Sequence, residues 1–265
     1  MGDLLRRWHR ALAEQSPAAV ATVVEGPGIG AKLLVTPEDH VGTAGNDDLD
    51  RAVIEAARGM LEGGRTGTIH LGPRGQRRME DVTVFVQAFA PPPRMYVFGA
   101  IDFASAVAKV GKFMGYRVTV CDARPVFATR ERFPTADEVV VAWPDEFLKT
   151  TPVDKRAVIC VLTHDPKFDV PVLVEALRTE AGYIGAMGSR RTHDNRTARL
   201  REEGVTDETL SRISSPIGLD IGARTPEETA VAIAAEIIAL HTGHSGGRLS
   251  ERSGPIHAAA RESAR

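Results

Sequence analysis

Residues 94–124, RMYVFGAIDFASAVAKVGKFMGYRVTVCDAR, decide the fold of this chain. The apolar residues 95–98 predict a strand, Gly99 predicts a turn, and a helix follows to about Met114. Residues 117–121 then predict a second strand. This order is that of a nucleotide-binding βαβ unit, in which the turn directs a helix N-terminus at a phosphate. The stretch therefore predicts an α/β fold with a Rossmann-like parallel sheet.

The turn departs from the full dinucleotide fingerprint. That fingerprint has glycine at the positions of Gly99, Ile101 and Ala104, and alanine is tolerable at the third. Ile101 places a branched side chain where a pyrophosphate would approach the backbone. Asp102 is placed to cap the helix and take the donors that an anion would use, while Asp122 is placed to meet a ribose hydroxyl. Two interpretations stay open: a nucleotide site, and a fold relic with a closed or altered site.

The composition restricts the class of protein. With 265 residues, of which 43% are hydrophobic and 26% charged, the chain is expected to be globular, with one large domain or two small ones. A net charge of −2 gives no field that would attract nucleic acid or an acidic membrane. No stretch approaches the roughly 20 apolar residues of a membrane helix. Cys121 and Cys160 lie in apolar runs, which predicts core residues and not a disulfide or metal site. We expect a cytoplasmic protein.

A proline run divides the chain. Residues 90–93 read APPP, and consecutive prolines cannot join a helix or a central strand. The sequence predicts a small α/β domain at 1–90, a proline linker at 91–93 and the Rossmann-like domain at 94–243. The polar, glycine-rich residues 244–265 have little apolar surface to bury, which predicts a flexible tail.

Hydrophobic periodicity and turn residues predict the remaining elements. In the first domain these are an N-terminal helix, a hairpin within 19–35, a helix at 46–61 capped by Asn46 or Asp47, and strands at 66–71 and 81–89. In the second domain they are a buried strand at 138–142, strands at 157–163 and 183–187, and helices near 170–178 and 189–203. Thr225, Pro226 and Glu228 predict the start of a last helix that ends near residue 240. This helix is apolar nearly all round, which predicts a homodimer.

Polar side chains follow the strand at 157–163. His164, Asp165 and Asp169 are suited to a divalent metal or to proton transfer, although their spacing matches no tight ligand pattern. The other interpretation is structural, with His164 ending the strand through a bond to a backbone carbonyl.

A second loop leads from a glycine turn into a helix. Ser189 is the expected cap, Gly188 precedes it, and Arg190 and Arg191 stand in the first turn. Cations there oppose the helix dipole, a penalty of about 0.5 kcal/mol each. That placement favours an anion bound jointly by the arginines and the helix N-terminus. The alternative is a solvated basic face that forms salt bridges to Asp194 or Glu202.

Six ordered blocks resemble the XdhC/CoxI family. They are FGAIDFA (98–104), VCDARPVFA (120–128), ERFPTADEV (131–139), LTHDPKFD (162–169), YIGAMGSRRT (183–192) and PIGLDIGARTPEETAVAIAAEIIA (216–239). Residues 28–35 and 41–50 resemble the family's N-terminal module more loosely. The resemblance implies an accessory protein of molybdenum hydroxylases such as xanthine dehydrogenase and carbon monoxide dehydrogenase. Such a chaperone would bind the molybdenum cofactor (molybdopterin), shield it during sulfuration and deliver it to the apoenzyme, usually as a homodimer and with a cysteine desulfurase as a further partner.

By its residues, this chain resembles a divergent member of that family. Where the family has a glycine pair followed by cysteine, the chain reads Gly45, Asn46, Asp47, and a further cysteine motif near residues 79–81 is absent. The family's glycine and histidine at the positions of Ile101 and Asp102 are also replaced. A thiolate contact to the metal is therefore not expected.

Two functions from different classes remain open. The favoured one is a maturation factor that is not an enzyme, because no nucleophile, base and orienting acid form one constellation. The alternative is an NAD(P)-dependent oxidoreductase, in which Asp122 would meet a 2′-hydroxyl and Arg124 a 2′-phosphate. The candidate cofactor-binding residues are Gly99, Ala100, Asp102, Asp122, Arg124, His164, Asp165, Gly188, Ser189, Arg190 and Arg191.

Overall fold

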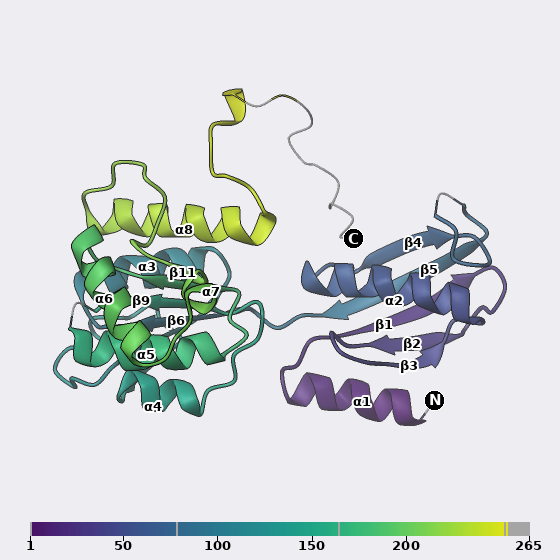
Figure 1. Ribbon diagram of the computed structural model, residues 1–265. Coiled ribbons are helices and arrows are strands. Elements are labelled where there is room, and N and C mark those ends of the chain that lie inside the picture. Colours follow the sequence, from purple (N-terminus) through teal and green to yellow (C-terminus); the bar gives the residue numbers. More distant parts are fainter. Residues whose placement is uncertain (1, 78, 164, 252, 254–265) are drawn as a thin grey trace. The chain divides into compact units, whose positions relative to one another are not determined.

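The computed structural model describes residues 2–77, 79–163, 165–251 and 253. The chain divides into two compact units, Met1–Pro91 and Pro92–Arg265, and each is described by itself (Figure 1). The expected flexible tail at 244–265 lies mostly outside the described residues, and its described part contains a short 3₁₀ helix, η1 (Leu249–Glu251).

The first unit is a five-stranded antiparallel sheet with the order β3-β2-β1-β5-β4. Its strands are β1 (Ala18–Glu25), β2 (Lys32–Val35), β3 (His40–Thr43), β4 (Gly67–Leu71) and β5 (Val82–Phe89). The predicted hairpin is confirmed as β1 and β2, with Ala19 opposite Val35. Strand β3 was not predicted, because HVGT holds one large apolar side chain and gives no alternating pattern.

Helices lie on both faces of this antiparallel sheet. Helix α2 (Asp47–Glu62) packs on the face to which Val84 and other alternate residues of β5 point. Asn46 caps it as predicted, with its side-chain oxygen accepting a 3.0 Å hydrogen bond from the N–H of Leu49. Helix α1 (Gly2–Ala13) lies on the other face, where the ring of Trp8 meets the ring of Phe89 edge-on at 6.4 Å (Figure 1).

The second unit is a six-stranded parallel sheet with the order β11-β10-β9-β6-β7-β8. Its strands are β6 (Arg94–Phe98), β7 (Arg117–Asp122), β8 (Glu138–Val141), β9 (Val158–Val161), β10 (Tyr183–Ala186) and β11 (Ile213–Ser214). When β6 to β11 are numbered 1 to 6, this is the doubly wound strand order 3-2-1-4-5-6. All strands are parallel, and the direction in which successive strands are added to the sheet reverses between β6 and β9. The predicted Rossmann-like parallel sheet is confirmed.

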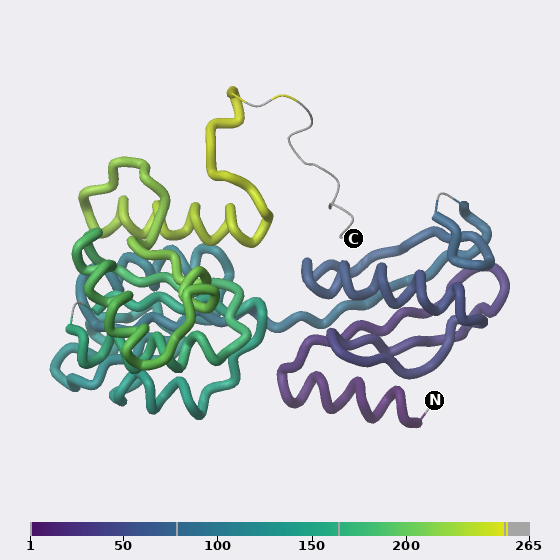
Figure 2. The backbone as a smooth tube through the Cα atoms, viewed as in Figure 1, coloured from purple at the N-terminus to yellow at the C-terminus, as the bar shows by residue number. Residues whose placement is uncertain are grey.

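Helices cover both faces of the parallel sheet, as its continuous apolar strands require. Helices α3 (Asp102–Phe113) and α8 (Pro226–Thr242) cover one face, and α4 (Pro144–Lys149), α5 (Pro166–Arg178) and α6 (Arg190–Glu202) cover the other (Figure 1). A short helix, α7 (Asp207–Leu210), precedes β11. Residues 215–225 then form a loop that leads into α8 (Figure 2), whose predicted capping box of Thr225 and Glu228 is present.

Two expectations about this unit need correction, and three short elements were not predicted. Strand β8 was expected to be buried, but it is an edge strand with Val141 52% exposed, because it has a neighbour on one side only. The helix predicted near 170–178 begins at Pro166, since Asp165 caps it and proline suits its first position. The short elements α4, α7 and β11 were not predicted, because so few residues give no periodic signal.

Candidate functional site

The reversal of strand order brings the turn after β6 beside the loop after β9. The N–H of Leu162 donates to the carbonyl oxygen of Phe98 at 2.8 Å. Gly99 has a φ of +103°, and a Cβ there would lie 2.7 Å from Cγ2 of Thr163. Both the backbone conformation and the close approach therefore require glycine. In open α/β sheets this crevice, outside the carboxyl ends of the strands, is where ligands bind.

The carboxylate of Asp122 holds this turn shut. Its Oδ2 accepts a 2.7 Å hydrogen bond from the N–H of Ala100, and its Oδ1 accepts from the N–H of Arg124 at 2.9 Å. The Arg124 guanidinium adds two bonds, Nε to Oδ1 at 2.9 Å and Nη2 to Oδ2 at 2.8 Å. The Asp122 side chain is only 3% exposed. A ribose hydroxyl would have to displace these bonds.

The same contacts set the charge state of Asp122. Burial favours the neutral acid, but the hydrogen bonds from Arg124 and Ala100 outweigh it and hold the pKa of the carboxyl below its usual value. Asp122 is therefore ionised at neutral pH and balanced by Arg124.

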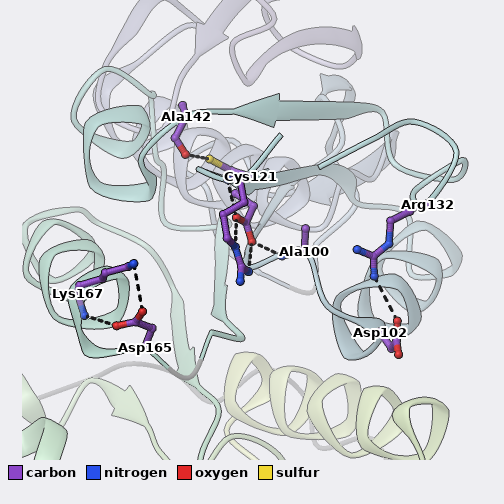
Figure 3. Close-up of polar contacts among 9 residues, drawn as sticks. Ala100, Asp102, Cys121, Arg132, Ala142, Asp165 and Lys167 are labelled. Atoms are coloured by element: carbon purple, nitrogen blue, oxygen red, sulfur yellow. Dashed lines mark hydrogen bonds and ion pairs between the residues drawn. The ribbon is translucent and has the colours of Figure 1, made fainter. Parts of the chain in front are cut away.

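Asp102 does not cap α3, so that expectation was wrong. The N-cap is Ile101, which forms no side-chain cap bond, and Asp102 is the first helical residue. Its carboxylate is 87% exposed and lies 3.4 Å from Nη2 of Arg132 (Figure 3). An aspartate one position too late cannot reach the N–H groups that a cap bonds. The side chain of Ile101, which was expected to fill the phosphate space, is partly buried against the core under α3.

In the loop after β9, Asp165 has a structural role. It is the N-cap of α5, where its Oδ1 accepts from the N–H of Lys167 at 3.1 Å and its Oδ2 lies 3.4 Å from Nζ of the same lysine (Figure 3). His164 lies outside the described residues. Within the described ranges no three His, Cys, Asp or Glu side chains are grouped so that they would hold a metal ion.

A buried ion pair links α5 to α6. Nη2 of Arg196 donates to Oδ2 of Asp169 at 2.8 Å and to the carbonyl of Met187 at 2.7 Å, and Nη1 reaches Oγ of Ser215 at 3.3 Å. Both charged side chains are less than 5% exposed. Burial raises the pKa of Asp169 to about 6, although the bond from Arg196 acts to lower it. Arg196 was not predicted as a site residue. The one signal for its burial is its position four residues before Leu200, the other buried residue of α6, which puts both on the same helix face.

This polar cluster is incompletely paired. In the part of the chain that the structure describes, three buried atoms have no hydrogen-bond partner: Oγ1 of Thr163, Oδ1 of Asp169 and Nε of Arg196. An unpaired buried polar atom costs about 1–3 kcal/mol. Thr163 stands in the loop after β9, and Arg196 is bonded to the loop after β10 through the carbonyl of Met187.

The glycine turn after β10 leads into α6 as predicted. Ser189 is the N-cap, and its Oγ accepts from the N–H of Thr192 at 3.2 Å. A Cβ on Gly188, whose φ is +151°, would lie 2.9 Å from Cβ of Thr192. Arg190 and Arg191 are both exposed. Across the described ranges, neither arginine has an ion pair or side-chain hydrogen bond, so the alternative of salt bridges to Asp194 or Glu202 is not seen.

Both cysteines are core residues, as expected. Cys121 and Cys160 are free and buried, and burial raises the pKa of each thiol to about 12. Neither is a thiolate at neutral pH, and neither is accessible to a metal or a sulfur donor. None of the helices in the described ranges has both the length and the apolar character that crossing a membrane requires.

Known proteins share this architecture. A family model described as the XdhC Rossmann domain matches residues 95–237, which is more than half of the chain, and one described as the XdhC and CoxI family matches residues 11–72. A crystal structure described as a xanthine dehydrogenase from Bacillus halodurans superposes with a TM-score of 0.53 at 20% identity, covering 94% of this chain and 98% of that one. That likeness shows the fold.

Two curated relatives are similar in sequence. The chain is 34% identical over 209 residues to a probable xanthine dehydrogenase subunit of Bacillus subtilis, covering 78% of this chain and 56% of that protein. It is 27% identical over 156 residues to the molybdenum cofactor insertion chaperone PaoD of Escherichia coli, covering 59% of this chain and 42% of that protein. The chain thus spans about half the length of these relatives. On the strength of the two family models, the chain belongs to the XdhC and CoxI family.

Proposed function

We propose that this chain is a maturation factor for a molybdenum hydroxylase, which binds the molybdenum cofactor as cargo and delivers it to the apoenzyme. The names of the two curated relatives support this role, since one is named for xanthine dehydrogenase and the other for insertion of the molybdenum cofactor. The structural observation that carries the proposal is a contrast on one sheet edge. At the turn after β6, the N–H of Ala100 is already bonded to Asp122. At the turn after β10, by contrast, the side chains of Arg190 and Arg191 are exposed to a ligand.

The open turn fits the phosphate of a molybdenum pterin. The first N–H groups of α6 and two exposed guanidinium groups, those of Arg190 and Arg191, provide the donors and the positive charge that an anion needs. The metal end of the cofactor has no such match, because Cys121 and Cys160 are buried thiols with raised pKa values. This chain would therefore hold its cargo through the pterin and phosphate groups and not through a metal–sulfur bond.

The bonds of Asp122 argue against the oxidoreductase alternative. The carboxylate that would meet a ribose is 3% exposed and already accepts from Ala100 and Arg124. Arg124, which would meet a 2′-phosphate, is turned to that same carboxylate. A nicotinamide dinucleotide would lose the bonds on which its recognition depends.

The partners follow from this role. We propose that the chain acts as a homodimer in the cytoplasm, that its client is a molybdenum hydroxylase apoenzyme, and that a cysteine desulfurase is a further partner during sulfuration. The apolar outer face of α8 supports the dimer, because Val231 and Ile238 are each 53% exposed there.

The test is retention of the cofactor. The protein is purified from a host that makes the cofactor and assayed for molybdenum and for the fluorescent oxidised pterin. Wild type should retain pterin, and Arg190→Ala with Arg191→Ala should retain at least roughly ten- to a hundredfold less, since the loss of even one charge-assisted bond costs about 1.5–3 kcal/mol. A control is Arg199→Ala with Arg201→Ala, which removes the same charge from the last turn of α6 and, in addition, the 2.8 Å bond from Nε of Arg201 to Asp207. Absence of pterin from wild type, beside a cysteine-containing relative that carries it, would contradict the proposal.

A further inference from the structure

Large apolar side chains are exposed together at the carboxyl ends of β7 and β8. Val126 is 78% exposed, Phe127 38%, Val141 52% and Trp143 52%. Strand pairing brings them close, because Val141 lies opposite Asp122 in the register of β7 and β8. A cluster of exposed apolar residues at the ligand edge of a sheet indicates a binding surface.

Aromatic rings and cations alternate across this surface. The guanidinium carbon of Arg124 lies 4.5 Å from the ring centroid of Phe127 and 5.9 Å from that of Phe168. Phe168 is buried, and the indole of Trp143 rests on it with ring centroids 5.1 Å apart and planes at 40°. We name Phe127, Trp143 and Arg124, with Phe168 beneath them, the aromatic platform. Further cations flank it: Nζ of Lys167 over Phe168 at 4.7 Å and the guanidinium of Arg132 over Phe127 at 5.4 Å.

The charges of the platform are nearly balanced. Each of these cations has an acid beside it: Arg124 with Asp122 at 2.8 Å, Lys167 with Asp165 at 3.4 Å and Arg132 with Asp102 at 3.4 Å. The platform therefore offers planar π surfaces and guanidinium faces more than net positive charge. Stacking on such faces tolerates many heterocycles, because every base has a π face.

We propose that the aromatic platform stacks the planar heterocycle of a phosphate-bearing ligand, either a nucleobase or a pterin. The inference deepens the proposed function, on which it rests, by naming the side chains that would take a ring end of the cargo. The platform belongs to the loops after β7 and β8 and to the first turn of α5, which follows β9, whereas the cationic turn of Arg190 and Arg191 follows β10. Ring and phosphate would thus be recognised by different loops of the same sheet edge.

The intrinsic fluorescence of the protein tests this directly. The chain has two tryptophans, so Trp8→Phe leaves Trp143 as the sole reporter. Cytidine monophosphate, adenosine monophosphate, a free pterin and inorganic phosphate are titrated separately. We expect saturable quenching by the ring compounds and none by inorganic phosphate. Quenching by the nucleotides alone would identify the bound heterocycle as a nucleobase, and quenching by the pterin alone would identify it as a pterin. Phe127→Ala should weaken binding about five- to a hundredfold, as loss of one stacking partner does.

Controls separate the platform from general effects. Phe113→Ala removes a ring that is 91% exposed at the far end of α3 and should leave the titrations unchanged. Trp143→Phe retains Trp8 and should show no saturable quenching. Absence of saturable quenching by every ring compound up to millimolar concentration would overturn the inference, as would equal binding by the Phe127→Ala variant. If the ring compounds quench the fluorescence but the purified protein retains no pterin from the host, the platform is supported and the maturation role is refuted. If the protein retains pterin but no ring compound quenches, the maturation role is supported and the platform is refuted.

Discussion

The Oδ2 of Asp122, at the end of β7, accepts a 2.7 Å hydrogen bond from the N–H of Ala100 in the turn after β6. In a dinucleotide-binding unit, the acid at this point and the turn facing it bind the ligand from two sides. Here the two are bonded to each other, and Arg124 completes the arrangement. In this chain the turn and the acid thus form a structural contact within the fold.

Asp122→Asn should destabilise the second unit measurably. The substitution keeps the shape of the side chain but loses the charge that accepts from Arg124 and Ala100, a change worth about 1.5–3 kcal/mol. The matched control is Asp102→Asn at the start of α3, whose exposed contact with Arg132 at 3.4 Å should matter by less than about 0.5 kcal/mol. Urea unfolding measures both. Equal midpoints for the two variants would show that the Asp122 bonds contribute nothing to stability.

Nicotinamide dinucleotides should not stabilise the protein more than adenosine monophosphate does. A ligand at 100 times its dissociation constant adds about 2.7 kcal/mol, which is visible as a rise in melting temperature. Because Asp122 is already bonded, about 1 mM NAD(H) or NADP(H) should raise the melting temperature no more than the same concentration of adenosine monophosphate, which the aromatic platform alone would bind. A clear shift that disappears in Asp122→Ala would refute the closed-turn interpretation and restore the oxidoreductase alternative.

The buried pair of Asp169 and Arg196 predicts an unusual pH dependence. With its pKa raised to about 6 from the usual 3.8, folded Asp169 binds its proton more tightly than the unfolded chain does. Stability should therefore fall as pH rises from about 4 to 6 and be level above that, by about 3 kcal/mol at most from this group. Asp122 acts in the opposite sense, since its lowered pKa stabilises the fold above about pH 4 and that contribution is lost at lower pH.

Asp169→Asn checks this dependence. The variant should be less stable at neutral pH, because Arg196 loses its buried partner, but its stability should no longer fall as pH rises from about 4 to 6. Urea midpoints at several pH values measure both effects. An unchanged slope in the variant would show that another group titrates in this window.

The sequence predicts those features of the structure whose signal lies within a few consecutive residues. Residues 94–124 predicted the order strand, turn, helix and strand correctly, because each step is local and carried by apolar runs and one glycine. The caps Asn46, Ser189 and Thr225 were also predicted, since a cap is recognised within four residues. The prediction that Asp102 caps α3 was wrong because the helix begins one residue earlier than that role requires, at Asp102 itself.

The contacts that shape the candidate site are not local. Asp122 and Ala100 are 22 residues apart, and Asp169 and Arg196 are 27 apart. Neither pairing has a periodicity or spacing from which it could be predicted without the strand order. The ring of Trp143 gave no signal either, because an aromatic residue after a short strand is usually core.

Removal of Arg190 and Arg191 should not destabilise the fold. Both are exposed in the first turn of α6, where cations oppose the helix dipole. The double alanine variant should be as stable as wild type or up to about 1 kcal/mol more stable, as measured by urea unfolding. This outcome separates a binding role from a structural one, since loss of pterin would then not be a folding defect. A loss of stability would indicate that the arginines hold the turn.

The outer face of α8 should form a homodimer contact. Val231 and Ile238 are two helical turns apart on one face, with the partly buried Ala235 between them, while the opposite residues of the helix are buried against α3 and the sheet. Light scattering at micromolar concentration should give about twice the chain mass of 28.5 kDa.

Val231→Glu with Ile238→Glu should give the mass of one chain, because two carboxylates cannot be buried unpaired in a contact. Phe113→Glu, at a more exposed apolar residue at the end of α3, is the matched control and should remain dimeric. A wild-type monomer across this concentration range would refute the dimer, and a dimer that persists in the double variant would place the contact on another surface.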